Sequence, residues 1–143
     1  MLRKLTALAV SGLTAAALCG PAPALAQSGN ISLELNAARD VEGTCRLIFV
    51  VTNNTGADLG DLAYEVVMFD SEGTVDELLT FGFGDMGKGR TKVRTFIIGE
   101  KSCGDIGRVL VNGEAACVTA DGGAGSCMNG LVTSSRTDIE FGT

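Results

Sequence analysis

The chain has 143 residues, with 11 basic side chains, 17 acidic side chains and no histidine. The lack of histidine excludes Ser-His-Asp and Cys-His catalytic sets, histidine metal sites and histidine-based pH switching. The excess of acidic over basic residues argues against binding to nucleic acid or to anionic lipid, because both require an excess of Lys and Arg.

The first 26 residues have the layout of a cleaved secretory signal peptide. A basic start at residues 2–4 precedes an apolar run over 5–18 and a small-residue cleavage site at 24–26. The apolar run is shorter than the roughly 20 residues that span a bilayer. We therefore expect a mature protein of residues 27–143 that is periplasmic or secreted, with no stable membrane insertion. This part of the chain has 9 basic and 17 acidic residues, a net charge of −8.

The mature chain begins with a pattern of β-strands separated by turns. Apolar and polar residues alternate over 31–35, which predicts a half-buried strand. Residues 44–52 form a longer strand with apolar residues on both faces, so we expect it to be central. Turn-forming residues at 53–56 end it, and a strand over 62–69 follows, with a tight turn at 70–73.

The second half of the chain continues the same pattern. A weaker strand over 75–81 leads through a glycine-rich connection to a strand over 90–98. Residues 108–112 and 114–118 flank Asn112-Gly113, which predicts a two-residue hairpin turn.

The chain ends with a loop and two short candidate strands. The loop covers residues 121–125, and the strands cover 131–133 and 138–141. The pattern predicts one all-β domain over 27–143, irregular from about residue 119. We expect an antiparallel β-sandwich of about seven strands, with a small β-barrel as the alternative.

The cysteines predict two disulfides. An even number of cysteines in an exported domain of this size is typical of a disulfide framework. Three pairings are possible, and we favour Cys45–Cys103 with Cys117–Cys127 because the strands at 44–52 and 90–98 are plausible antiparallel neighbours. A zinc site is the alternative, but the paired C-x-x-C spacing is lacking. Cys19 lies in the leader, and its lipidation is the alternative to simple cleavage, although Leu18 stands where a small residue is expected.

A family resemblance lies in residues 45–98. The resemblance depends on a sequence pattern formed by three segments: Phe49–Gly56, the strand that ends at Phe69-Asp70, and Lys88–Thr91. It resembles bacterial extracytoplasmic immunoglobulin-like domains of the FxLYD type. The chain departs from the family in reading Val67-Met68-Phe69-Asp70 and in carrying four cysteines with a long tail. The resemblance implies a fold and an extracytoplasmic setting, but no reaction and no catalytic residues.

Eight acids and no base lie between residues 58 and 85, and two interpretations of them stay open. The first is a Ca²⁺ site, since Ca²⁺ prefers clustered oxygen ligands, although the calcium-loop order D-x-D-x-D-G is lacking. The second, which we favour, is a solvated sheet face with turn acids, so we expect no metal and no cofactor. The acids are Asp58, Asp61, Glu65, Asp70, Glu72, Asp76, Glu77 and Asp85.

Two neighbouring features form the candidate interaction surface. Lys88, Arg90, Lys92 and Arg94 are spaced by two and would share one face of a strand. They would bind an acidic partner or a glycan, pair with nearby acids, or protect a sheet edge. The segment 81–86 alternates glycine with large apolar residues. Phe83 and Met86 would either be exposed anchors of a recognition loop or pack under the sandwich.

No catalytic set is visible, because Ser102, Ser134 and Ser135 lack a general base nearby in sequence. We expect a non-catalytic exported module of the cell envelope, with a protein-interaction or structural role and a protein partner. The first alternative is a small-ligand, glycan or ion binder. The second is a secreted protease inhibitor that presents the loop at 81–89.

Overall fold

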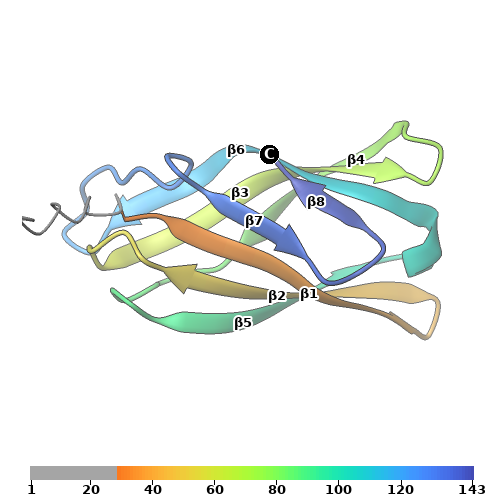
Figure 1. Cartoon of the computed structure of the whole chain (residues 1–143), viewed down its shortest axis with the longest axis horizontal. Coiled ribbons are helices and arrows are strands. Elements are labelled where there is room, and N and C mark those ends of the chain that lie inside the picture. Colours follow the sequence, from red (N-terminus) through yellow and green to blue (C-terminus); the bar gives the residue numbers. More distant parts are fainter. Residues whose placement is uncertain (1–28) are drawn as a thin grey trace, which may run out of the picture.

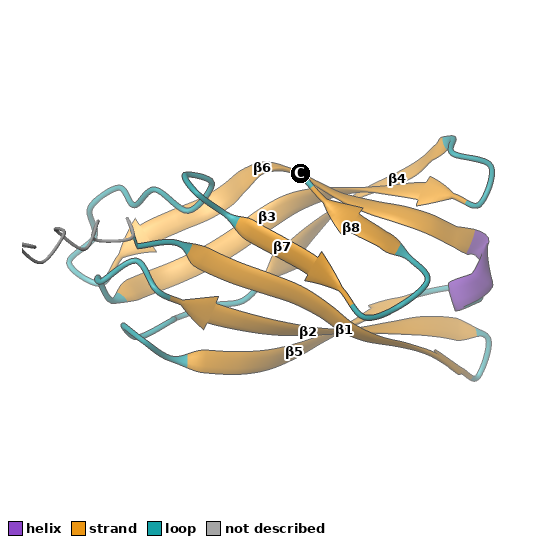
Figure 2. Cartoon of the chain, viewed as in Figure 1, coloured by secondary structure: helices purple, strands orange, loops and turns teal. Residues whose placement is uncertain are grey.

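The computed structural model describes residues 29–143 as a β-sandwich of two four-stranded sheets (Figures 1 and 2). The predicted signal peptide, its cleavage site and Cys19 lie outside these residues. The strands are β1 (Ile31–Val41), β2 (Thr44–Asn53), β3 (Leu59–Asp70), β4 (Val75–Gly82), β5 (Thr91–Ile98), β6 (Ile106–Thr119), β7 (Val132–Ser135) and β8 (Glu140–Gly142), with one 3-10 turn, η1 (Cys103–Asp105).

The strand order is β5-β2-β1-β7 in one sheet, called sheet A here, and β4-β3-β6-β8 in the other, called sheet B. Two separate sheets confirm the predicted sandwich. The strands number eight among the described residues, because both short C-terminal segments form strands.

The last part of the chain crosses from one sheet to the other (Figure 1). β7 pairs in parallel with β1 in sheet A, and β8 pairs in parallel with β6 in sheet B. All other strand pairs are antiparallel. The predicted irregular segment after residue 119 is therefore a loop followed by two edge strands.

The core lies between the sheets and follows from side-chain alternation. In β2, Cys45, Leu47, Phe49 and Val51 are fully buried, while the residues between them lie on the outer face. The Phe49 ring has four aromatic neighbours, with centroid distances from 5.3 to 6.4 Å. The predicted central position of this strand is confirmed, since it pairs with β1 on one side and β5 on the other.

Both disulfides form in the favoured pairing. Cys45 and Cys103 have their Cα atoms 4.7 Å apart, and Cys117 and Cys127 have theirs 5.9 Å apart. Cys45 lies opposite Ile98, the last residue of β5, so the next few residues bring Cys103 back to the start of β2. The neighbouring position of β2 and β5 is therefore what makes this pair possible.

The predicted hairpin at Asn112-Gly113 is wrong. β6 runs without a turn from Ile106 to Thr119, because it pairs with β3 along its whole length. Asn112 is the extra residue of a bulge, since Gly113 lies opposite Glu65 and Val111 lies opposite the next residue of β3. A bulge absorbs the turn-forming dipeptide without reversing the strand.

The two-residue turn that does form joins β1 to β2. Glu42 and Gly43 have φ values of 48° and 79°. Positive φ at both central residues matches the right-handed twist of the flanking strands. No helix in residues 29–143 is long and apolar enough to cross a membrane.

Candidate interaction surface on the edge strand β5

Phe83 and Met86 are fully buried, so the hypothesis that they are exposed anchors is wrong. The β4–β5 loop (residues 83–90) carries the chain from sheet B to sheet A, and its apolar side chains fill the space between them. The Phe83 ring lies 6.1 Å from the Tyr64 ring and 5.5 Å from the Phe96 ring, measured between centroids. Met86 forms an isolated antiparallel bridge with Leu59.

The β4–β5 loop is held by a buried amide at the end of β2. The Asn53 side chain is fully buried, and its Nδ2 donates to Ala57 O and Met86 O, each at 2.8 Å. Its Oδ1 accepts from the backbone N–H and the hydroxyl of Thr55, at 3.0 and 2.7 Å. All the hydrogen-bonding groups of one side chain thus fix the turn after β2 and the loop that leads into β5.

The four basic residues do not share one strand face, which corrects the prediction. β5 begins at Thr91, so Lys88 and Arg90 precede the strand. Lys92 and Arg94 lie on the same side of β5 as Phe96, which packs against the core. The four residues follow one another along the end of the β4–β5 loop and the start of β5, and we call them the basic edge.

Two members of the basic edge contact the β4–β5 loop. The Arg94 guanidinium donates to Phe83 O from Nε at 3.2 Å and from Nη2 at 3.0 Å. Lys92 Nζ lies 3.1 Å from Asp85 Oδ1 and also donates to Asp85 O. The hydrogen bond and charge of Lys92 lower the pKa of the Asp85 carboxyl. Within the described residues, Lys92 is the only member of the basic edge in a salt bridge.

The opposite side of β5 carries an exposed aliphatic face that the sequence analysis missed. Val93 and Ile97 are 62% and 63% exposed. Val93 lies directly opposite Val50 of β2, and Ile48 lies opposite Thr95, between the two exposed residues. We call Ile48, Val50, Val93 and Ile97 the aliphatic face. Its signal was the alternation of β-branched residues with the bases along residues 91–97.

The backbone of β5 is open on one side, because the strand pairs only with β2 in the described part of the chain. Asn53 N donates to Arg90 O at 3.0 Å. Opposite residues in an antiparallel ladder alternate between hydrogen-bonded and free pairs. Counting from the hydrogen-bonded pair Asn53–Arg90, every second pair along β2 and β5 is therefore also hydrogen-bonded. The β5 residues of the intervening pairs direct their N–H and C=O groups away from β2. These residues are Thr91, Val93, Thr95 and Ile97.

Several acids are used within their own turns or in ion pairs. Asp70 Oδ1 accepts from the backbone N–H groups of Glu72 and Thr74, at 2.9 and 2.8 Å. Asp58 Oδ1 accepts from Lys88 N at 2.7 Å, and Asp76 pairs with Lys101.

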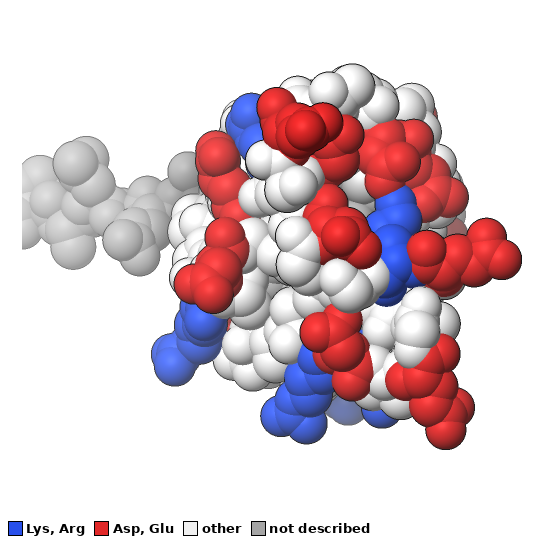
Figure 3. Space-filling model, turned by 90° about the vertical axis from the view of Figure 1, so that its right-hand side faces the viewer, with Lys and Arg blue, Asp and Glu red and all other residues white. Residues whose placement is uncertain are grey.

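Acidic side chains gather at the end of the sandwich formed by the β1–β2 turn, the β3–β4 turn and η1 (Figure 3). In residues 29–143 the group with metal-ligand spacing is Glu114 with Cys117 and Cys127. The two sulfur atoms of this group form a disulfide, whereas metal ligation needs thiolates.

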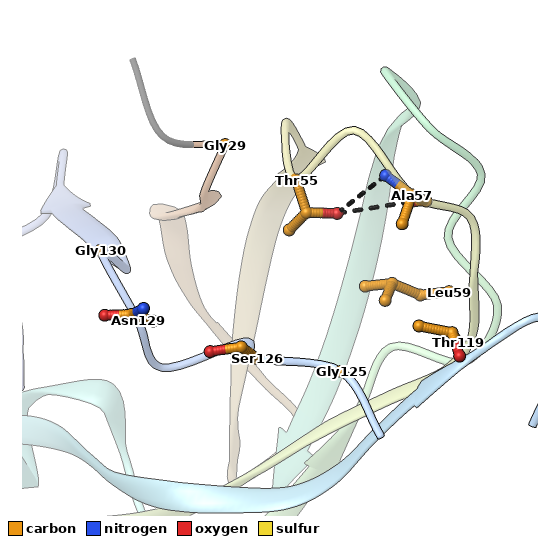
Figure 4. A pocket seen from close by; sticks show the side chains of 9 residues that line it. All are labelled: Gly29, Thr55, Ala57, Leu59, Thr119, Gly125, Ser126, Asn129 and Gly130. Carbon is orange, nitrogen blue, oxygen red and sulfur yellow. Dashed lines mark hydrogen bonds between the residues drawn. The ribbon is translucent and has the colours of Figure 1, made fainter. Parts of the chain in front are cut away.

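A hollow of about 300 Å³ lies at the opposite end of the sandwich (Figure 4). Its polar lining is largely committed to the protein itself. The Thr55 hydroxyl contacts Asn53 Oδ1 and the Ala57 backbone, and the Thr119 hydroxyl contacts Gly123 O. Ser126 and Asn129 supply the other polar side chains, and none of the described residues that line the hollow is charged.

Two of the three serines considered as nucleophiles, Ser102 and Ser135, have structural contacts. Ser102 Oγ donates to Asp105 Oδ2 at 3.1 Å, within the turn that begins η1. Ser135 Oγ donates to Ile139 O at 2.8 Å and so shapes the crossing between β7 and β8.

Comparison with protein-family models, curated proteins and solved structures finds no match to this chain. The resemblance to FxLYD-type domains therefore stays a prediction.

Proposed function

We propose that the protein is a non-catalytic, exported module of the cell envelope that binds another protein through sheet A at β5. The observation that carries this proposal is the aliphatic face, in which two large β-branched side chains are more than half exposed beside two others. Two disulfides support an oxidising, extracytoplasmic setting. The predicted signal peptide and the resemblance to immunoglobulin-like envelope domains agree with it.

The aliphatic face is a small target. With strands about 4.8 Å apart and alternate positions about 6.7 Å apart, the four residues give a face of roughly 130 Å². A standard protein interface buries about 800 Å² on each partner. The interface must therefore extend beyond these four residues, and the basic edge and the open backbone of β5 are the adjoining surfaces.

Photo-crosslinking in the envelope tests this proposal. A photoreactive amino acid at Val93 should give one defined adduct with another protein. The matched control is Leu78 of β4, which is 57% exposed but lies on sheet B. The same crosslinker at Leu78 should not give this adduct. Equal adducts from both positions, or none from Val93, would contradict the proposed surface.

A substitution sharpens the test. Ile97→Lys places a charge in the aliphatic face, and we expect it to remove the Val93 adduct while the melting temperature stays within a few degrees. Leu78→Lys is the control with the same change in charge, and it should leave the adduct intact. An adduct that survives Ile97→Lys would show that the aliphatic face does not make the contact.

The hollow in Figure 4 is one candidate site for the ligand-binding alternative, and a larger hollow of about 630 Å³, lined in part by Arg136 and Asp138, is another. A small neutral ligand in the first hollow would raise the melting temperature on titration, by mass action. The protease-inhibitor alternative depended on an exposed loop at 81–89, and the burial of Phe83 and Met86 removes the large apolar side chains from its surface.

A further inference from the structure

We propose that the partner contributes an extended segment, acidic at alternate positions, which adds to sheet A as a new strand along β5. This inference rests on the proposed function and names the kind of partner that the surface fits. Addition of a strand to an open sheet edge is a general mode of peptide recognition, in which the main chain supplies affinity and alternate side chains supply specificity.

The backbone of β5 has hydrogen-bonding groups on its open edge that an added strand could pair with. Four consecutive odd-numbered residues, from Thr91 to Ile97, direct their N–H and C=O groups to the open edge. The pairing of β2 with β1 supports this assignment, because Asn54 N donates to Asn30 O, so that even-numbered residues of β2 bond to β1 and odd-numbered ones to β5. A strand placed beside β5 would hydrogen-bond to these four residues. This would supply the contact area and the hydrogen bonds that the aliphatic face lacks by itself.

The side chains of β5 specify the two faces of the added strand. The residues that bond to it, including Val93 and Ile97, have their side chains on the outer face of sheet A. Neighbours of these residues on the added strand would therefore be β-branched or aliphatic. On the other face the added strand would lie beside Lys92 and Arg94, which favours acidic residues at the alternate positions.

Charge separates this partner from a second copy of the chain. Residues 27–143 carry a net charge of −8, with acidic side chains gathered at one end of the sandwich (Figure 3), whereas the basic edge has Lys92 and Arg94 on β5 and Lys88 and Arg90 in the loop that leads into it. Pairing of two β5 strands would bring these cations together, and like charges on neighbouring strands are destabilising. An acidic segment from another protein is the complementary occupant.

Peptides of defined pattern test the inference on the disulfide-bonded protein of residues 27–143. The first probe alternates Val and Glu over eight residues, the length of β5, and the second replaces each Glu by Lys. By fluorescence anisotropy we expect the Glu peptide to bind at least about tenfold more tightly, equal to ~1.4 kcal/mol. Its affinity should fall as salt rises. Equal affinity of the two peptides would overturn the charge argument.

N-methylation of the Glu peptide tests for a strand. Methyl groups on alternate amides block one hydrogen-bonding edge of a peptide and leave the other free. One of the two alternate sets should abolish binding and the other should not. Equal tolerance of both sets would overturn strand addition.

Variants of one residue separate strand addition from simple contact with the aliphatic face. Val93→Pro removes an N–H that faces the open edge and makes no hydrogen bond to β2. An edge strand tolerates proline at such a position. We expect a folded protein whose affinity for the Glu peptide falls at least about tenfold, or ~1.4 kcal/mol. Val93→Thr keeps the N–H and the β-branch, so it should bind the peptide with nearly unchanged affinity. Equal weakening by both variants would overturn strand addition in favour of face contact.

The remaining outcomes distinguish this inference from the proposed function. A Val93 photo-adduct together with no binding of the Glu peptide would leave the proposed function standing and overturn the inferred segment. Self-association in sedimentation equilibrium that Val93→Pro abolishes would make a second copy the occupant and overturn the inference. The absence of both adduct and peptide binding would contradict the inference and the proposed function together.

Discussion

Replacement of Asn53 by Asp should be among the most damaging isosteric changes in this protein. The side chain is fully buried and donates from Nδ2 to two backbone carbonyls, those of Ala57 and Met86. In Asn53→Asp both donors are replaced by a buried oxygen, so two hydrogen bonds of the side chain are lost and the carbonyls of Ala57 and Met86 face a carboxylate. A buried polar group left without its hydrogen bond costs about 1–3 kcal/mol.

Two such losses give a destabilisation of about 2–6 kcal/mol at pH 7, against a typical total stability of about 5–15 kcal/mol. At about 4 °C per kcal/mol for a domain of this size, the melting temperature should fall by about 8–24 °C. Urea denaturation followed by circular dichroism measures the free energy of unfolding. Acidification should restore part of it, because a protonated carboxyl can donate to one of the two carbonyls.

Asn54→Asp is the matched control. Asn54 is exposed, and its side chain has one long contact of 3.5 Å with Asn30. The same change in charge one residue away should therefore alter stability by less than about 0.5 kcal/mol. If Asn53→Asp and Asn54→Asp unfold at the same urea concentration, the buried amide does not hold the β4–β5 loop.

Three further predictions concern the core and the loop. Tyr64 is the single tyrosine, and burial raises the pKa of its phenol, so its ionisation, followed by ultraviolet absorbance, should occur only with unfolding. The contribution of this phenol to the free energy of unfolding is present in full below the ordinary tyrosine pKa of about 10 and is lost at higher pH. Phenolate formation while the protein is still folded would contradict this prediction. Replacement of Cys45 and Cys103 by Ala should lower the free energy of unfolding by up to about 4 kcal/mol, measured with urea, and an unchanged midpoint would show that the pair does not constrain the unfolded chain. Lys92→Met should raise the pKa of Asp85 in a carboxyl NMR titration, because the hydrogen bond and charge that lower it are removed, whereas Lys88→Met should leave it unchanged.

Sequence patterns predicted the strands well where side-chain alternation is strong. β2 shows this most clearly, since its odd-numbered residues are buried and its even-numbered ones lie on the outer face. The pairing of Cys45 with Cys103 followed from the same pattern, because it required only that two predicted strands be neighbours. These features depend on residues close together in sequence or on one pairing between strands.

Errors arose where a local signal competed with pairing over a long distance. Asn112-Gly113 is a strong hairpin signal, but β3 offers a partner for all of β6, and continuous pairing outweighs one turn. For Phe83 and Met86 the local sequence left two interpretations open, exposed anchors or packing under the sandwich, and their burial confirms the second. Their burial depends on the passage of the β4–β5 loop between the sheets, which no local pattern reveals.

The sequence by itself determined the all-β class and the alternation that separates core from surface, because these depend on side-chain chemistry at short spacing. It also favoured the disulfide pairing that forms, because two predicted strands were expected to be neighbours. Only the tertiary structure decided that β5 lies at an edge, that Val93 and Ile97 are exposed there and that Lys92 and Arg94 lie on the other face of this strand. The physical reason is that a strand's place in a sheet depends on which other strands outcompete it for partners. That competition involves the whole chain, and the same alternating residues would be buried if another strand lay beside them.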